Sequence, residues 1–86
     1  MSDVTRSEGG DFTVNAALIG SAFGLDPASV PAMMREGRIT SRCETGEDSD
    51  AGRHRLHFYF GARTLRLTVA DDGTILRRAL FVSPAR

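Results

Sequence analysis

The sequence predicts a small α+β domain in which two short N-terminal helices pack on one face of an antiparallel β-meander of about four strands. Apolar residues recur with helical spacing before residue 37, and they alternate with polar residues between residues 39 and 69. Short glycine-containing turns separate the alternating segments. Because closing a short loop costs little entropy, such segments are expected to pair as antiparallel hairpins.

The chain begins with a polar segment that ends in Gly-Gly, so we expect a mobile tail over residues 1–10. Residues 12–14 (Phe-Thr-Val) alternate and predict a possible short strand. Asn15 is a suitable N-cap for a first helix over residues 16–23, and Gly24 stands where a helix-ending glycine is expected.

The second helix is predicted to begin within residues 27–31, because Asp26-Pro27 supplies a capping carboxylate and a proline suited to the first turn. A tight first turn is expected, since Ser29 and Pro31 offer a second possible start. The helix should end near Glu36, before Gly37, with three apolar side chains facing inward: Val30, Met33 and Met34.

Four segments alternate with a period of two and predict strands, over residues 39–45, 53–60, 63–69 and from 74 to at least 78. Turns are expected at residues 46–52, at Gly61-Ala62 and at Asp71-Asp72-Gly73. Residues 79–82 are apolar enough to pack back, with residues 12–14 as a candidate neighbour. Residues 11–82 therefore read as one domain, and residues 83–86 should fray.

The two-residue period sorts the strand residues onto two faces of the sheet. The face toward the helices should carry Ile39, Cys43, Leu56, Phe58, Phe60, Leu65, Leu67 and Val69. The opposite face should be open to solvent and carry Thr40, Arg42, Glu44, Arg53, Arg55, His57, Tyr59, Thr64, Arg66 and Thr68.

The composition narrows the class of protein. Eleven basic and eleven acidic residues give a formal net charge of zero, which removes the simplest argument for nucleic acid or an anionic membrane as a partner. All the basic residues are arginines, as is typical of GC-rich bacterial genomes. The single cysteine, the lack of an apolar leader and the short apolar stretches favour a cytoplasmic protein without a membrane segment.

Metal and cofactor sites are not expected. The acidic segment over residues 47–52 lacks the carboxylate that anchors calcium in an EF-hand. His54 and His57 are three apart on a strand and should point to opposite faces, and Cys43 with one histidine makes no zinc site. No phosphate-binding glycine loop is present.

Catalysis is not expected either. Cys43 is predicted to lie in the core, where a thiol is usually inert, although a thiol or redox role stays open as an alternative. The carboxylates near residues 44–50 lie on or beside a turn that has nothing apolar to raise their pKa.

The charged sheet face favours a protein-interaction or accessory module whose partner is another protein or a second copy. Arginine and tyrosine are enriched at interfaces. Nucleic-acid binding through the same face is the alternative. It is less favoured, because the face carries a single aromatic residue, Tyr59, for base stacking, and the acidic Glu44 would repel phosphates. The candidate binding surface comprises Arg38, Arg42, Glu44, Arg53, Arg55, His57 and Arg66.

One motif adds a family resemblance. It reads G-R-I-T-S-x-C-E-x-G-E over residues 37–47 and D-A-G-R-x-R-L-x-F over residues 50–58. With the Leu25-Asp26-Pro27 turn and the Leu65-Arg66-Leu67 strand, the chain resembles, over residues 11–78, a family of small bacterial proteins of unknown function, common in alphaproteobacteria. The resemblance implies one bacterial cytoplasmic domain and carries no activity, cofactor or catalytic residue.

Overall fold

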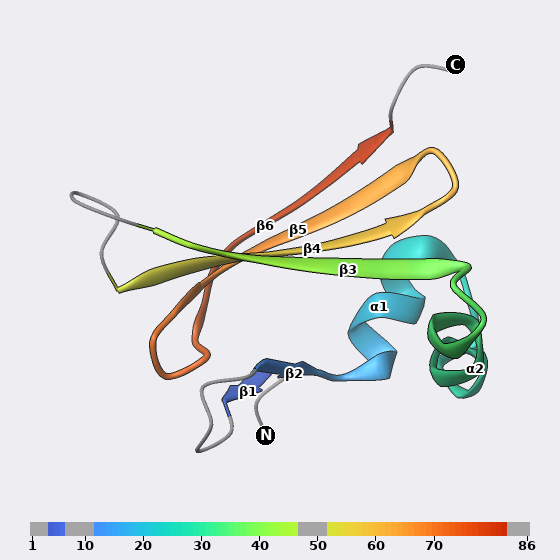
Figure 1. Cartoon of the computed structure of the whole chain (residues 1–86), viewed down its shortest axis with the longest axis horizontal. Helices are drawn as coiled ribbons and strands as arrows, with labels where there is room; N and C mark the ends of the chain where they lie inside the picture. Colours follow the sequence, from blue (N-terminus) through green and yellow to red (C-terminus); the bar gives the residue numbers. More distant parts are fainter. Residues whose placement is uncertain (1–3, 7–11, 47–51, 83–86) are drawn as a thin grey trace.

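A computed structural model of the chain describes residues 4–6, 12–46 and 52–82. These residues form the α+β fold that the sequence predicts, with the helices and a small hairpin on one side of a larger sheet (Figure 1). In chain order the elements are β1 (Val4–Arg6), β2 (Phe12–Val14), α1 (Ala16–Phe23), a 3-10 turn (Pro27–Ser29), α2 (Val30–Arg35), β3 (Ile39–Thr45), β4 (Arg53–Phe60), β5 (Arg63–Ala70) and β6 (Ile75–Val82).

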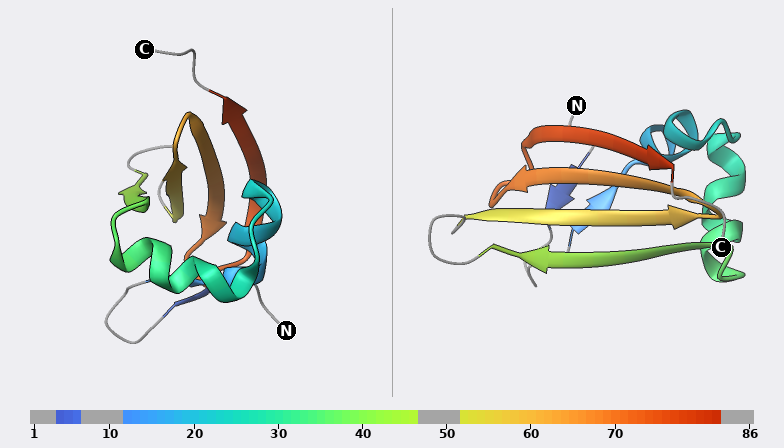
Figure 2. Two further views of the ribbon diagram at one scale, coloured as in Figure 1. Left: turned by 90° about the vertical axis from the view of Figure 1, so that its right-hand side faces the viewer. Right: turned by 90° about the horizontal axis from the view of Figure 1, so that it is seen from above.

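The larger sheet is an antiparallel meander in the order β3-β4-β5-β6, and β1 pairs with β2 in a separate antiparallel sheet. Seen from above, the meander lies in front of β1 and β2, and the helices gather at one end of it (Figure 2). We call the side that packs on the helices and on β1 the inner face, and the opposite side the outer face. No described helix or strand covers the outer face.

The helices begin and end where their capping residues predict. The Asn15 side chain accepts a hydrogen bond from the Ala17 amide at 2.9 Å, and Gly24 ends α1 with a φ of 71°. A 3-10 turn precedes α2 and supplies the expected tight start. The prediction for Met34 is wrong, because its side chain is exposed while Val30 and Met33 are buried.

Alternation is confirmed in the two central strands. Leu56 and Phe58 on β4 pair with Leu67 and Leu65 on β5, and all four are buried on the inner face. They pack with residues of α1 and α2, so one hydrophobic core fills the space between the sheet and the helices. Phe60 is half-buried and packs against Phe23 of α1 at 5.5 Å between ring centroids.

The prediction that Cys43 lies in the core is wrong. Cys43 does pair with Leu56, so its register is the expected one, but its side chain is exposed. β3 is an edge strand, and beyond Ile39 its inner-face positions lie outside the hydrophobic core. Parity thus placed Cys43 on the correct face without showing how far the helices extend along that face.

The N-terminal strands depart from the prediction in two ways. Residues 4–6, expected within a tail, form β1, and the Val4 side chain is buried in the core. β2 pairs with β1, whereas residues 79–82 continue β6 along β5. The other residues of the expected tail and the expected frayed end, 83–86, lie outside the described residues.

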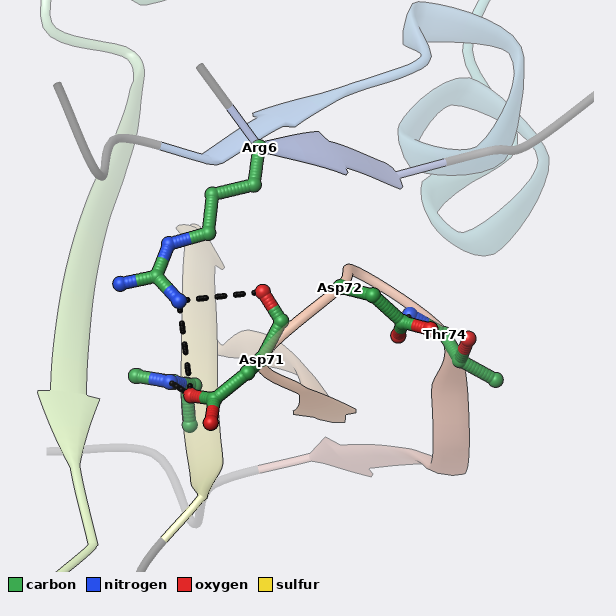
Figure 3. Close-up of polar contacts among 5 residues, drawn as sticks. Arg6, Asp71, Asp72 and Thr74 are labelled. Atoms are coloured by element: carbon green, nitrogen blue, oxygen red, sulfur yellow. Dashed lines mark hydrogen bonds and ion pairs between the residues drawn. The ribbon is translucent and has the colours of Figure 1, made fainter. Parts of the chain in front are cut away.

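A polar cluster fastens the N-terminal hairpin to the turn between β5 and β6 (Figure 3). Arg6 Nη1 donates to the Asp71 carbonyl oxygen at 3.0 Å and lies 3.4 Å from its carboxylate Oδ1. The same Oδ1 is 2.7 Å from Nε2 of His54, a buried residue on β4. Because an ionised carboxylate only accepts, the imidazole Nε2 carries the hydrogen of this bond.

The Asp71-Asp72-Gly73 turn is confirmed, and the backbone of β1 packs closely against it. Gly73 has a φ of 90°, and a Cβ built there would lie 2.8 Å from the Val4 carbonyl oxygen. The turn therefore requires glycine both for its backbone conformation and for the approach of β1.

Candidate binding surface on the outer face of the sheet

The outer face carries ordered rows of polar and charged residues across the meander. One row runs Glu44, Arg55, Thr68 and Arg77 from β3 to β6, each residue directly opposite the next. The next row runs Arg42, His57, Arg66 and Ala79 in the same way. Diagonal neighbours on one face are also within reach of long side chains, so Arg66 on β5 lies near both Arg55 on β4 and Arg77 on β6.

A cleft of about 360 Å³ lies over the first of these rows, toward the end where β3 finishes and β4 begins. Among the described residues, four arginines and one carboxylate line it, together with two threonines. The lining residues are Glu44, Thr45, Gly46, Arg53, Arg55, Arg66, Thr68, Leu76 and Arg77. We call this set the arginine cleft.

Among the described residues that line the arginine cleft, arginines outnumber acidic residues. Glu44 is the one acidic residue of this described lining, and its Oε1 lies 3.9 Å from Arg42 Nε and 3.9 Å from His57 Nδ1, both outside the cleft. These separations are too long for strong hydrogen bonds, and the Arg42–Glu44 pair is exposed, so it contributes little stability. The described lining of the cleft therefore holds more guanidinium groups than carboxylates.

Aromatic side chains continue the outer face beyond the arginine cleft. The rings of His57 and Tyr59 stack with an interplanar angle of 12° and a centroid separation of 6.1 Å. The Arg66 guanidinium lies over the Phe81 ring, 4.8 Å from its centroid, in a cation–π contact. Charge and flat apolar surface are thus combined on one face.

The structure brings together most of the predicted surface. Glu44, Arg53, Arg55 and Arg66 line the arginine cleft, and Arg42 and His57 lie in the neighbouring row. Arg38 lies apart: it precedes β3, and its Nη1 is 3.9 Å from Oε1 of Glu36.

Sequence reasoning missed Arg77, because a β-bulge changes the register of β6. Val69 pairs with Ile75, whereas Thr68 pairs with Arg77, so Leu76 is the extra residue. Without the bulge, Arg77 would lie opposite Leu67 on the inner face. The sequence from 74 to 78 carries no pattern that predicts the bulge.

A second cavity, of about 490 Å³, opens on the inner side between β2, the helices and β3. Its lining is largely apolar and includes Phe12, Ile19, Met34 and Phe58, with Cys43 at β3. Among the described residues, no three of the His, Cys, Asp and Glu side chains are grouped so that they could hold a metal ion.

Within the described ranges, no helix has the length and apolar character needed to cross a membrane. No curated protein and no solved structure matches the chain. A family model does match it, over residues 1–86. The chain belongs to this family, which is described as a family of unknown function (DUF6522).

Proposed function

We propose that the protein is a non-enzymatic interaction module of the bacterial cytoplasm that binds an acidic segment of a partner protein in the arginine cleft. The observation that carries this proposal is the convergence of four arginines from β4, β5 and β6 on one cleft. Guanidinium groups bind carboxylates through two parallel hydrogen bonds, which gives geometric selectivity as well as attraction.

The chemistry of the cleft favours binding over catalysis. Guanidinium groups stay protonated at physiological pH and act by charge and hydrogen bonding, not by transferring protons. The hydroxyl of Thr68, which lies on the outer face, can add a neutral hydrogen bond to the same ligand. Leu76 offers apolar contact beside it, so an acidic peptide with an apolar side chain next to its carboxylates fits the cleft.

The test is the binding of a fluorescein-labelled peptide rich in Glu and Leu, followed by fluorescence anisotropy. Arg77→Gln should weaken binding about tenfold, because a charge-assisted hydrogen bond contributes about 1.5–3 kcal/mol. Arg78→Gln is the matched control: Arg78 is the next residue on β6, is also exposed, and pairs with Leu67 on the inner face. Equal effects of the two variants would contradict the proposal.

Nucleic-acid binding through the same face is the second candidate, and the stacked His57–Tyr59 pair is the observation that favours it. The discriminating ligand is a single-stranded oligothymidylate of similar length to the peptide. Phosphate binding weakens steeply with salt. An oligonucleotide that binds more tightly than the peptide at physiological salt, and loses affinity in Tyr59→Ala, would replace the first proposal with the second.

A thiol role of Cys43 is the third candidate. The exposed Cys43 side chain adjoins the apolar cavity, so reagents can reach it. A functional thiol should react with a disulfide reagent at neutral pH faster than free cysteine does, since activated thiols carry more thiolate. A rate equal to that of free cysteine would argue against this role.

A further inference from the structure

The two edges of the meander differ in their exposed side chains. On β6, four large apolar residues are exposed: Leu76 by 52%, Leu80 by 49%, Phe81 by 43% and Val82 by 72%. β3, at the other edge, exposes hydroxyls, charges and the Cys43 thiol instead. Single exposed apolar residues such as Leu76 are ordinary on protein surfaces, but the three consecutive residues Leu80, Phe81 and Val82 on an edge strand mark an interaction site.

The apolar residues of β6 project from both faces of the sheet. Phe81 pairs with Thr64 on the outer face, whereas Leu80 and Val82 pair with Leu65 and Arg63 on the inner face. An element lying on one face would cover only one of the two sets. A strand added to the edge of the sheet flanks both sets, and its backbone also satisfies the unpaired N–H and C=O groups of the edge.

We propose that β6 is a homodimer interface in which it pairs antiparallel with β6 of a second copy. An antiparallel pair of identical strands has two-fold symmetry, so the association closes at two copies. β6 carries no proline, which would block such pairing, and its two charged residues are Arg77 and Arg78. The polar edge at β3 leaves the pair no comparable surface for further growth.

Symmetry and the bulge restrict the register to two possibilities. A two-fold axis perpendicular to the sheet passes through a residue position, because directly opposite side chains share a face. The regular part of β6 is residues 77–82, so five consecutive pairs form only when Ala79 or Leu80 lies on the axis. With Ala79 on the axis, Arg77 faces Phe81 of the other copy. With Leu80 on the axis, Phe81 faces Ala79 of the other copy. In neither register does an arginine face an arginine.

Pairing in this way gives a continuous eight-stranded sheet with both arginine clefts on one side. One strand pair buries less area than a standard interface of about 1,600 Å², so we expect a reversible dimer with a Kd on the order of micromolar. The proposal is independent of what the arginine cleft binds.

The test is sedimentation equilibrium of the full chain from low to high micromolar concentration. We expect a concentration-dependent dimer that Leu80→Glu weakens at least tenfold. Ser41→Glu is the matched control, because it places the same charge at an exposed inner-face position of the other edge strand. A monomer throughout the range would overturn the proposal, and so would a dimer lost equally in both variants. Circular dichroism confirms that each variant is folded.

Cysteine cross-linking in a Cys43→Ser background reads the register. Opposite residues have Cα atoms about 4.5–5.5 Å apart, within the range of a disulfide. On oxidation, either Ala79→Cys or Leu80→Cys should give a covalent dimer, and Ser41→Cys should not. Cross-linking at neither position while the dimer persists would overturn the pairing through β6, as would an efficient Cys43 disulfide in the unmodified chain.

Discussion

The two faces of β4 and β5 differ sharply although their residues alternate along the same strands. Leu65, Leu67 and Val69 are buried almost completely on the inner face. Between them, Thr64, Arg66 and Thr68 stand half-buried on the outer face, where no described element covers them. Positions one residue apart along the same strand therefore have different roles in the fold: inner positions build the core with the helices, and outer positions are not needed for it.

Adjacent substitutions on β5 test this separation with the largest expected effect. Leu67 has no exposed surface, so Leu67→Ala should lower the free energy of unfolding by about 2–5 kcal/mol. Arg66→Ala should change it by less than about 1 kcal/mol, because it removes one cation–π contact on the open outer face. Urea denaturation measures both. Similar losses in the two variants would show that the two faces of β5 do not differ in their contribution to stability.

A glycine substitution asks whether β1 belongs to the inner layer. Gly73→Ala should cost about 1–3 kcal/mol, because the added Cβ meets the Val4 carbonyl oxygen and the backbone has a positive φ. Gly61→Ala is the control: φ is also positive there, at 57°, but nothing lies within 4 Å of the added Cβ. Thermal unfolding should therefore show the larger loss for Gly73→Ala, and equal losses would mean that β1 does not press on the turn.

Among the described residues, His54 is the one polar side chain that is buried on the inner face. Asp71→Ala removes its hydrogen-bond partner and should cost about 1–3 kcal/mol, since a buried polar group is left unsatisfied. Asp72→Ala, one residue along the same turn, should cost less, because the hydrogen bond that Asp72 accepts from Thr74 is local to the turn and exposed. If denaturation ranks the two variants the other way, the cluster of Arg6, Asp71 and His54 does not fasten the hairpin.

The smallest expected effect concerns pH. Hydrogen bonds from the Thr74 side chain and backbone hold the pKa of Asp72 below its ordinary 3.8. A depressed pKa means that the carboxylate stabilises the fold fully above pH 3.8 and loses this contribution as the pH falls further. Asp72→Asn should therefore flatten the acid side of the melting temperature profile slightly. An unchanged profile would show that the turn bonds are not maintained in solution.

The sequence predicted the central sheet well because β4 and β5 alternate without interruption and are joined by a tight turn at Gly61. The prediction was wrong at positions where a bulge interrupts the alternation, and at positions where the face of the sheet alone does not determine whether a side chain is buried. The bulge at Leu76 moved Arg77 to the outer face, and no residue type there announces it. Cys43 kept its register, but its exposure depends on how far the helices reach along β3.

The strand at the N-terminus was not predicted, for a different reason. Three polar-flanked residues, 4–6, carry too short a pattern to predict a strand, and Val4 is fixed by long-range packing. The candidate surface was predicted from charge and parity, so the residues of regular strands, such as Arg55 and Arg66, fell together in the arginine cleft. Arg38 has the spacing of an outer-face residue of β3, but it lies before the strand begins, and its guanidinium group is near the carboxylate of Glu36.

The most direct test of the outer face as a binding surface is a nuclear magnetic resonance titration of the full chain with the acidic peptide, following the arginine Nε–Hε signals. If the peptide binds in the arginine cleft, the signals of Arg55, Arg66 and Arg77 move together and saturate at one common Kd, while those of Arg63 and Arg78 stay in place. Movement of the Arg63 and Arg78 signals without the other three would contradict binding in the arginine cleft.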